Sequence, residues 1–400
     1  MASLRQDPIH ILKITLLADE WASLAGGLST LNRELAINLA AQPNVEVTLL
    51  VPENAQITEK HKKEAKSSGI TIAKAKERPG YEDPLDWLSW PPHDVTMDVV
   101  IGHGMKLGRQ GQVLRESKSC LWVQLVHTAQ EQLGIHKSRT NAISEAARKH
   151  QIEVNLCKLA DLVVPVGPKL AEAYSSCLRS EEGKDIFVLT PGLFKEFAHL
   201  KRHRNESSEF KVLLCGRGDS KIFELKGYDI GAKAFADQEL NGKPYRLLFV
   251  GAPDGEEDEV ASELLKYGIA KEQLTVRKFV DSRDKMKELF SEVDLVIMPS
   301  KTEGFGLIAL EALSAGLPIL VSGNSGFAKA LGDSEIGNFC IVDSKEPKDW
   351  AKKIKAVREK HGEWLQDIQA LRESYGKEYS WEKQCIDLVK KLRKMVHGMN

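Results

Sequence analysis

The fold is decided by the stretch Pro299-Ser-Lys-Thr-Glu-Gly-Phe-Gly-Leu-Ile-Ala-Leu-Glu-Ala-Leu-Ser-Ala-Gly-Leu-Pro318. Apolar runs flank it on both sides, over residues 293–298 and 319–322, and each is typical of a buried parallel strand. Glycines open a turn after the first run, a helix is predicted over residues 307–315, and Gly316 ends it. A strand, a turn and a helix in this order aim backbone N–H groups beyond the carboxyl end of the strand, where phosphate is the favoured ligand.

Two carboxylates frame this turn. Glu303 lies in the loop before the predicted helix, and Glu311 lies eight residues later, inside it. An ionised carboxylate only accepts hydrogen bonds, so it suits sugar hydroxyls and does not suit phosphate. The combination favours a ligand that carries both phosphate and polyol, such as a nucleotide sugar. The alternative is an ordinary strand–turn–helix unit with two solvated glutamates.

Length and composition are those of a globular protein with more than one domain. The 400 residues are 42% hydrophobic and 28% charged, which is enough for two sizeable cores. The formal net charge is -1, which argues against nucleic acid or an acidic membrane as the main partner. Residues 54–78 are rich in lysine, and we interpret them either as a solvated helix face or as a surface for a membrane or a polyanion.

The cysteines and the N-terminus predict a cytoplasmic protein without a membrane span. The six cysteines are scattered without the paired spacing of a metal site, and several lie in apolar runs, so we expect reduced, buried thiols. Residues 1–8 lack an apolar signal core, and no run approaches the roughly 20 apolar residues of a spanning helix. Because the sequence has no Asp-x-Asp motif and no His/Cys cluster, neither a metal nor another cofactor is predicted.

The first half of the chain is predicted to alternate strands with helices. A strand over residues 9–17, a loop that ends in Gly26 and Gly27, a helix and a strand over residues 45–51 form one unit. The glycine turn permits close approach of a phosphate or a substrate. Because there is no Gly-x-Gly-x-x-Gly, the usual dinucleotide-binding fingerprint is not supported.

Two further predicted strands, over residues 97–104 and 121–127, end close to a histidine each. His103 and His127 would therefore lie at the carboxyl edge of the sheet, where open α/β sheets bind ligands. Either histidine could donate to a sugar hydroxyl or a phosphate, and the alternative is a histidine satisfied by the backbone. The segments expected to form loops in this half are residues 20–27, 79–93, 104–112 and 128–141, and the family resemblance given below implies that they bind an acceptor.

A second strand–helix series follows a Pro-Gly turn and a charged stretch. Its first strand, predicted over residues 210–216, leads into a loop that carries Arg217, Lys221 and Lys226. Cations placed there could neutralise a diphosphate, although each could also be a solvated surface cation. Amphipathic helices are predicted over residues 349–374 and 381–396.

The alternation throughout both halves predicts an α/β protein with two doubly wound, Rossmann-like domains and a cleft between them. We predict an N-terminal domain over residues 1–195 and a linker over residues 196–209. A second domain follows over residues 210–375, and residues 376–400 are predicted to form a C-terminal helix.

The motifs taken together resemble those of the retaining GT-B glycosyltransferases of family 4. Glu303-Gly-Phe-Gly-Leu-Ile-Ala-Leu-Glu311 resembles the Glu-x7-Glu signature of that group, and Gly26-Gly27-Leu resembles its N-terminal glycine loop. Val126-His127-Thr128 resembles its strand-end histidine. Cys215-Gly-Arg217 with Lys226-Gly-Tyr-Asp229 resembles its diphosphate loop. Tyr379-Ser-Trp381-Glu382 resembles its late helix, which in that fold crosses back onto the N-terminal domain.

The resemblance implies that the N-terminal domain binds the acceptor and that the C-terminal domain binds the nucleotide sugar, and it implies a role for each matching position. Arg217 and Lys226 would hold the donor diphosphate, Glu311 the ribose hydroxyls, Glu303 the transferred sugar, and His127 that sugar near the reacting centre. The remaining donor-binding positions would be Gly26, Gly27, Lys221, Val280, Arg283, Gly304, Phe305, Gly306 and Leu307. No metal ion is implied, since electrostatic stabilisation of the departing nucleotide diphosphate would carry the catalysis.

The sequence departs from the family pattern beside the donor site. The loop from Arg217 to Lys226 is longer than usual, so either Lys221 or Lys226 could hold phosphate. Ser322 stands where glycine is common and Lys329 where glutamate is common, and both put the donor and the turnover in question.

The predicted function is a retaining, metal-independent transfer of a hexose-type sugar from a UDP- or GDP-sugar to a small-molecule or glycan acceptor. One alternative is a catalytically weak GT-B domain that binds a nucleotide sugar as a sensor or scaffold. A sugar phosphorylase of the same fold is a third possibility.

Overall fold

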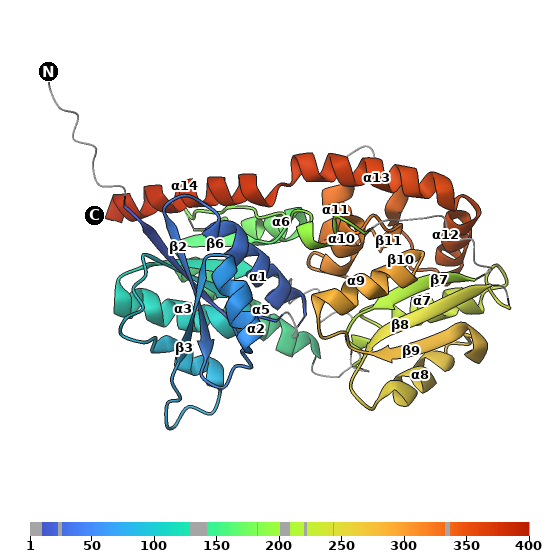
Figure 1. Cartoon of the computed structure of the whole chain (residues 1–400), viewed down its shortest axis with the longest axis horizontal. Helices are drawn as coiled ribbons and strands as arrows, with labels where there is room; N and C mark the ends of the chain where they lie inside the picture. Colours follow the sequence, from blue (N-terminus) through green and yellow to red (C-terminus); the bar gives the residue numbers. More distant parts are fainter. Residues whose placement is uncertain are drawn as a thin grey trace, which may run out of the picture.

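The computed structural model describes residues 10–22, 26–128, 142–181, 183–200, 209–219, 222–242, 244–332 and 337–399. Within them the chain forms two sheets of six strands each, one after the other along the length of the molecule (Figure 1). All strand pairs in both sheets are parallel. The predicted α/β architecture of two doubly wound domains is confirmed.

The first sheet has the strand order β3-β2-β1-β4-β5-β6. Every residue of β4 and β5 is buried, as expected for apolar strands covered by helices on both faces. The strands are β1 (Leu12–Leu17), β2 (Val45–Pro52), β3 (Ile70–Ala75), β4 (Val99–His103), β5 (Leu121–Val126) and β6 (Leu162–Pro165). The helices are α1 (Gly27–Ala40), α2 (Glu59–Ser67), α3 (Gly104–Lys118), α5 (Ala142–Leu159) and α6 (Pro168–Cys177).

The second sheet has the strand order β12-β11-β10-β7-β8-β9. Its strands are β7 (Phe210–Cys215), β8 (Tyr245–Ala252), β9 (Leu274–Lys278), β10 (Leu295–Met298), β11 (Ile319–Ser322) and β12 (Ile341–Val342). Its helices are α7 (Tyr228–Ala236), α8 (Glu257–Leu265), α9 (Arg283–Glu292), α10 (Leu307–Ser314), α11 (Gly326–Gly332), α12 (Pro347–Glu359) and α13 (His361–Glu378).

The strand order reverses once in each sheet, between β1 and β4 and between β7 and β10. On either side of such a point the connections leave toward opposite faces of the sheet, so a crevice opens at the carboxyl ends of the two strands. The segments after β1, β4, β7 and β10 include the glycine pair Gly26 and Gly27, the diphosphate-loop candidates and Glu303. The topology therefore places the sequence motifs of both domains at the positions where this fold binds ligands.

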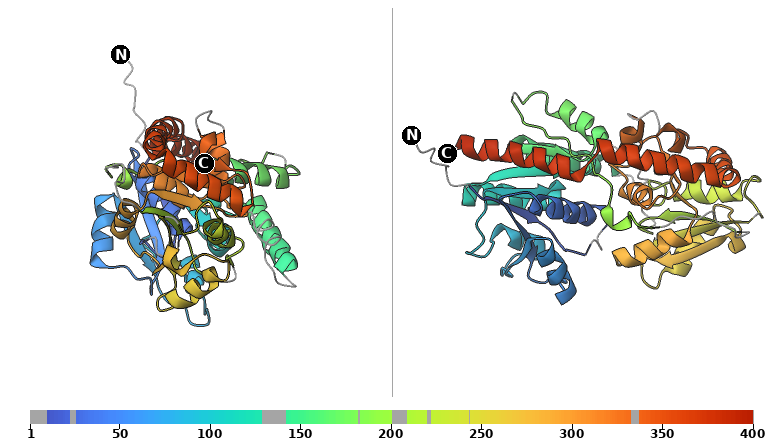
Figure 2. Two further views of the ribbon diagram at one scale, coloured as in Figure 1. Left: turned by 90° about the vertical axis from the view of Figure 1, so that its right-hand side faces the viewer. Right: turned by 45° about the horizontal axis from the view of Figure 1, so that its top comes forward.

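The last helix, α14 (Trp381–Met399), lies along the N-terminal domain, whereas α13 lies along the C-terminal domain (Figures 1 and 2). Gln384 on α14 accepts from the backbone N–H of Thr190 at 2.7 Å and donates to its carbonyl at 2.6 Å. Farther along α14, Arg393 Nη2 donates to the carbonyls of Pro43 and Asn44 at 3.0 and 2.9 Å. The end of the chain is thus fastened to the first domain.

Two sequence predictions about elements are wrong. Residues 104–112, expected to be an acceptor-binding loop, are the first turns of α3, whose start at Gly104 follows β4 without a connecting segment. The single helix expected over residues 349–374 is two helices, α12 and α13, which meet at Lys360. The buried positions of α12 and α13 follow one another at helical spacing across Lys360, so periodicity alone did not reveal the break.

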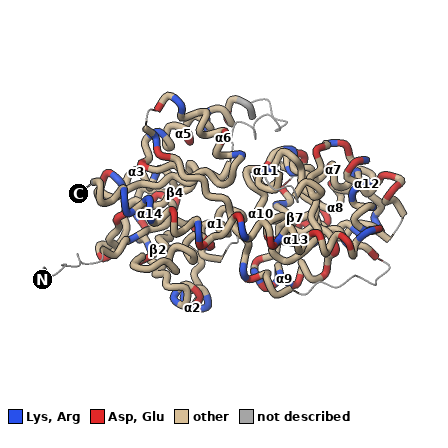
Figure 3. The backbone as a smooth tube through the Cα atoms, turned by 90° about the horizontal axis from the view of Figure 1, so that it is seen from above, with Lys and Arg blue, Asp and Glu red and all other residues tan. Residues whose placement is uncertain are grey.

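Charged residues of both signs are distributed over the described part of the chain (Figure 3). The lysine-rich residues 54–78 form α2 and β3. On α2, Lys62 Nζ lies 2.7 Å from Glu59 Oε1, and Lys60 Nζ lies 3.9 Å from Glu64 Oε1. Lysines paired along their own helix are typical of a solvated helix face. Among the described helices, none has both the length and the apolar character needed to cross a membrane.

Candidate active site

The loops after β7 and β10 meet through Lys226 and Glu303. Lys226 Nζ lies 2.5 Å from Glu303 Oε2, and 31% and 21% of the two side chains are exposed to solvent. An ion pair that keeps this much exposure can still contact a ligand. The structure therefore brings together the two residues that the sequence resemblance relates to the diphosphate and to the transferred sugar.

The glycine after Lys226 explains why this lysine reaches Glu303. Gly227 has a φ of +67°, and a Cβ at that position would lie 2.0 Å from the carbonyl oxygen of Pro299. Just beyond, the backbone N–H of Lys301 donates to the carbonyl of Leu225 at 2.9 Å. Only glycine permits this close approach of the two loops. The Lys-Gly sequence thus docks the Lys226 loop on the segment that leads to Glu303.

The turn before α10 takes its shape from Gly306, which has a φ of +108°. It directs the chain from the end of β10 into α10, as the sequence predicts. The ring of Phe305 is buried, lies 5.8 Å from the ring of Phe327, and faces Gly167 of the first domain. Phe305 therefore packs between the domains, and any ligand contact at this residue would come from its backbone.

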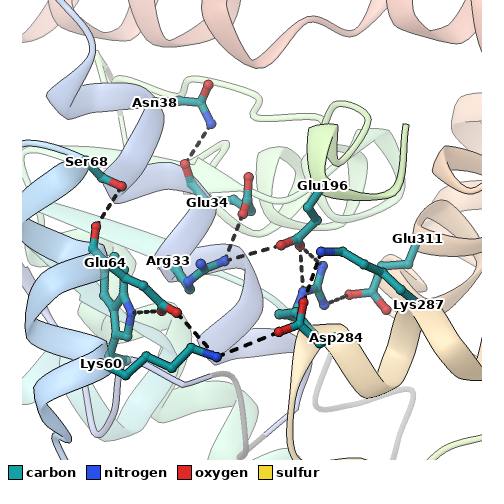
Figure 4. Close-up of polar contacts among 12 residues, drawn as sticks. Arg33, Glu34, Asn38, Lys60, Glu64, Ser68, Glu196, Asp284, Lys287 and Glu311 are labelled. Atoms are coloured by element: carbon teal, nitrogen blue, oxygen red, sulfur yellow. Dashed lines mark hydrogen bonds and ion pairs between the residues drawn. The ribbon is translucent and has the colours of Figure 1, made fainter. Parts of the chain in front are cut away.

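Glu311 lies buried on α10 and is held by an arginine (Figure 4). Arg283 Nη1 donates to Glu311 Oε1 at 2.5 Å, and Arg283 Nε donates to Glu196 Oε1 at 2.6 Å. Burial raises the pKa of the Glu311 carboxyl, and the charge of Arg283 opposes that rise. Arg283 was expected to border the nucleotide base, and the structure places it directly against the carboxylate expected to bind ribose.

Two other predicted donor-site positions of the second domain, Arg217 and Val280, are described by the structure. Arg217 is exposed just beyond the end of β7, and its carbonyl accepts from Tyr228 Oη at 3.3 Å. Val280 is half-buried and packs on the core before α9. Lys221 lies outside the described residues, so its competition with Lys226 for the phosphate role stays open. Among the described residues, no three His, Cys, Asp or Glu side chains are grouped so that they could hold a metal ion.

The first domain contacts the Glu303–Leu307 turn directly, at three glycines. A Cβ on Gly304 would lie 2.0 Å from the carbonyl oxygen of His127, and a Cβ on Gly167 would lie 2.6 Å from the Phe305 ring. At Gly27 a Cβ would lie 3.2 Å from Leu307 Cδ1. The missing side chains let Gly304 approach the backbone of His127, and they let Gly167 and Gly27 approach the side chains of Phe305 and Leu307. The structure thus brings His127 and the N-terminal glycine loop to the turn that carries the Glu-x7-Glu motif.

His103 and His127 form a stacked, hydrogen-bonded pair at the ends of β4 and β5. His103 Nδ1 lies 2.8 Å from His127 Nε2, and the rings are 5.0 Å apart with an interplanar angle of 15°. The other nitrogen of His103, Nε2, lies 2.7 Å from Asn32 Oδ1. Burial lowers the pKa of His127 to about 4 and that of His103 well below its usual value, so both rings are neutral at neutral pH.

Lys169 is a residue of the interface that the sequence reasoning missed. It extends from the first turn of α6 to the second domain, where Nζ donates to Thr302 Oγ1 at 2.9 Å and to the carbonyl of Glu303 at 3.2 Å. The same ammonium donates to the carbonyl and Oδ1 of Asn324 at 2.8 and 2.9 Å. Burial lowers the pKa of Lys169 to about 8. The available signal was its place directly after Gly167-Pro168, at the carboxyl end of a strand.

The departures from the family pattern also lie at this interface. Lys329, on α11, pairs with Glu172 of α6, so the lysine that stands in place of an acidic residue joins the two domains. Ser322 Oγ accepts from the backbone N–H of Asn324 at 3.3 Å and thereby shapes the loop that Lys169 contacts. The sequence reasoning related these residues to the donor pocket, and the structure shows them in contacts between or beside the domains.

Comparisons with known proteins agree with this geometry. The sequence model of the family described as "Family 4 Glycosyltransferase in conflict systems" matches residues 15–388. The D-inositol 3-phosphate glycosyltransferase of Corynebacterium urealyticum is 26% identical over 331 residues, which are 76% of this chain and 73% of that protein. Its namesake from Corynebacterium diphtheriae is 27% identical over 285 residues, 66% of this chain and 63% of that protein.

Among solved structures, the sucrose-phosphate synthase of Thermosynechococcus elongatus superimposes with a TM-score of 0.73 at 18% identity. The superposition covers 97% of this chain and 100% of that one, so the two proteins share one fold over their whole lengths. Since the family model spans both sheets, the chain belongs to the family 4 glycosyltransferases found in conflict systems.

Proposed function

We propose that this protein transfers a hexose-type sugar from a UDP- or GDP-linked donor to an acceptor hydroxyl, with retention at the anomeric carbon and without a metal ion. The observation that carries the proposal is the partly exposed ion pair of Lys226 and Glu303. It lies at the strand-order reversal of the second sheet, and the backbone of His127 contacts the adjoining Gly304. A cation and a carboxylate side by side suit the two ends of a nucleotide sugar, its phosphates and its polyol.

Each charged group has a place in the transfer. The bond between the anomeric carbon and the diphosphate oxygen breaks, and the nucleoside diphosphate leaves with the bonding electrons. Lys226 and Arg217 would stabilise the charge that grows on its oxygens, and this replaces a metal ion in the proposal. Glu303 would accept from hydroxyls of the transferred sugar. The acceptor hydroxyl forms the new bond to the anomeric carbon on the same face and gives its proton to the departing diphosphate oxygen.

Binding of the nucleotide ribose requires Glu311 to share its carboxylate. Arg283 occupies one of its oxygens and also holds Glu196. A ribose could take the second oxygen of Glu311, or Arg283 could shift toward Glu196. Either arrangement keeps the arginine paired, so the exchange leaves no buried charge without a partner.

The acceptor is proposed by analogy with the relatives. Those named above are D-inositol 3-phosphate glycosyltransferases, so D-inositol 3-phosphate is the first acceptor to test. Glycans and other small polyols are the next acceptors to test.

The test is turnover with a panel of UDP- and GDP-sugars, read as nucleoside diphosphate release and as the anomeric configuration of the product, in buffer containing a chelator. We expect one donor to be consumed with retention. Glu303→Gln should lower kcat by about 100-fold or more with nucleotide affinity kept. Lys226→Met should lower both turnover and nucleotide affinity. Glu292→Gln, which alters an exposed ion pair with Arg277, is the matched control and should leave turnover unchanged.

Two outcomes would replace this proposal, and a third would change the role of one residue. Tight nucleotide binding without release from any donor would favour the sensor or scaffold. Turnover that depends on inorganic phosphate would favour the phosphorylase. Unchanged UDP affinity in Lys226→Met would move the phosphate role to Lys221.

A further inference from the structure

The orientation of the Asn32 amide is fixed by its own hydrogen bonds. Asn32 lies buried on α1, and its Nδ2 donates to the carbonyl of Leu17 at the end of β1, at 3.0 Å. A carbonyl oxygen only accepts, so the amide nitrogen must face Leu17 and the amide oxygen must face His103. The Asn32 Oδ1 therefore needs a donor, and the nitrogen 2.7 Å away is His103 Nε2.

His103 consequently carries its proton on Nε2. Its ring is fully buried, and the cost of burial keeps it neutral because burial lowers its pKa well below the usual value. A neutral imidazole has one N–H and one bare nitrogen. With the proton on Nε2, the Nδ1 of His103 is bare and can only accept.

His127 must then supply the proton between the two rings. Its Nε2 lies 2.8 Å from the bare Nδ1 of His103, so a hydrogen bond there requires a proton on His127 Nε2. Burial holds His127 neutral too, since its pKa falls to about 4. The Nδ1 of His127 is therefore left without a proton.

We infer that Asn32 and His103 are positioning residues that fix the tautomer of His127, so that its Nδ1 presents a lone pair to a hydroxyl of the transferred sugar. The inference rests on the proposed function for the identity of the ligand. The hydrogen-bond chain from Leu17 through Asn32 and His103 to His127 runs in one direction, and each member depends on the one before it.

This direction decides between the two ligands that the sequence left open for His127. A sugar hydroxyl can donate to a bare nitrogen, whereas an ionised phosphate oxygen cannot. A phosphate oxygen against Nδ1 would place two acceptors in contact. His127 would thus select the polyol part of the donor and would leave the phosphates to Lys226 and Arg217, which reverses the donating role expected from the sequence.

The tautomer is measured directly by long-range ¹H–¹⁵N correlation on protein labelled at histidine. We expect the His127 Nε2 signal at the position of a protonated imidazole nitrogen and the Nδ1 signal at that of a bare one, with His103 likewise protonated at Nε2. His127→Gln assigns the signals by their disappearance. A bare Nε2 on His127, or a doubly protonated ring at pH 7.5, overturns the inference. This readout needs no substrate, so it fails separately from the proposed function.

Two variants of His103 test its positioning role. In His103→Asn the amide oxygen takes the place of Nδ1 and can still accept from His127, whereas His103→Leu offers no acceptor. We expect the asparagine variant to keep the His127 tautomer and the leucine variant to give a mixture of tautomers. With an active donor, His103→Leu should lower kcat/KM about tenfold, and His103→Asn should restore most of it. The same tautomer in both variants shows that His103 does not fix it.

Discussion

At the scale of single residues, the carboxyl group of Glu34 stands out for its charge state. It lies on α1 next to the ion pairs of Arg283, and only 12% of its side chain is exposed (Figure 4). Burial and the nearby charge of Glu196 raise its pKa from 4.5 to about 7, although Arg33 and Arg283 oppose the rise. Near neutral pH, Glu34 is therefore only partly ionised.

This shift predicts how stability depends on pH. The folded protein holds the Glu34 proton more tightly than the unfolded chain does. The contribution of protonated Glu34 to the free energy of unfolding is therefore fully present below pH 4.5 and is lost as the pH rises through about 7. Glu34→Gln mimics the protonated form, so it should match the natural protein at pH 5 and exceed its free energy of unfolding by roughly 2–3 kcal/mol at pH 8. Urea denaturation at both pH values measures this.

The control for Glu34 is Glu46→Gln, which neutralises an exposed glutamate on β2. The difference in free energy of unfolding between this variant and the natural protein should be the same at pH 5 and at pH 8. If the difference in free energy of unfolding between Glu34→Gln and the natural protein were the same at pH 5 and pH 8, Glu34 would titrate in the folded protein as it does in the unfolded chain.

Residue types and spacing in the sequence predicted much of the candidate site, but not the residues that orient it. Glu303, Lys226 and His127 follow apolar strands, so the parallel topology brings them together. Asn32 and Lys169 lie inside helices, and nothing in local spacing shows that one faces His103 and the other the second domain. Such contacts depend on how distant elements pack, which periodicity does not encode.

At the scale of elements, strands and glycine turns were more predictable than helix limits. Apolar runs predicted β10 and β11 nearly to the residue, and the glycines on either side of α10 predicted its limits. The helix α3 was missed because it is rich in glycine and follows β4 without a turn, at Gly104. Its glycines pack on β5, where a Cβ at Gly111 would lie 2.5 Å from Trp122 Nε1. Low helix propensity was thus overridden by packing.

The contact of the Glu303–Leu307 turn with the end of β5 gives a prediction for Gly304. A methyl group there would overlap the carbonyl oxygen of His127, because an ideal Cβ lies 2.0 Å from it. Gly304→Ala should therefore separate the two domains locally and lower the free energy of unfolding by roughly 1–3 kcal/mol. Turnover should fall as well, since His127 and Glu303 would move apart. Urea denaturation and donor turnover measure the two effects.

Gly362→Ala is the matched control for this substitution. Gly362 lies in α13, and a Cβ there meets nothing within 4 Å. Alanine should be neutral or stabilise the protein by up to about 1 kcal/mol because it favours the helix. If Gly304→Ala behaved like this control, the close contact between the domains would not exist in solution.

At the scale of the whole molecule, the interface between the domains contains residues that depart from the family pattern. Lys169 and Glu172 of α6 face Asn324 and Lys329 of the second domain. Lys329 replaces a residue that is commonly acidic in the family, and here Glu172 supplies the acid from the opposite domain. At Lys329 the departure from the family pattern thus forms an ion pair between the two domains.

Lys169 provides the test of how strongly this interface holds. Lys169→Met keeps the aliphatic stem but removes the donor to Thr302, the Glu303 carbonyl and Asn324. We expect a loss of roughly 1–3 kcal/mol in the free energy of unfolding, because Thr302 Oγ1 and the Glu303 carbonyl lose a charged donor at a partly buried site. Small-angle scattering should show a larger radius of gyration as the domains separate.

Lys390→Met is the matched control, because it removes an exposed cation from α14. It should change the free energy of unfolding by less than about 0.5 kcal/mol and leave the scattering curve unchanged. If Lys169→Met matched Lys390→Met in both measurements, the domains would be held by the glycine contacts and by α14, and Lys169 would not contribute to their association.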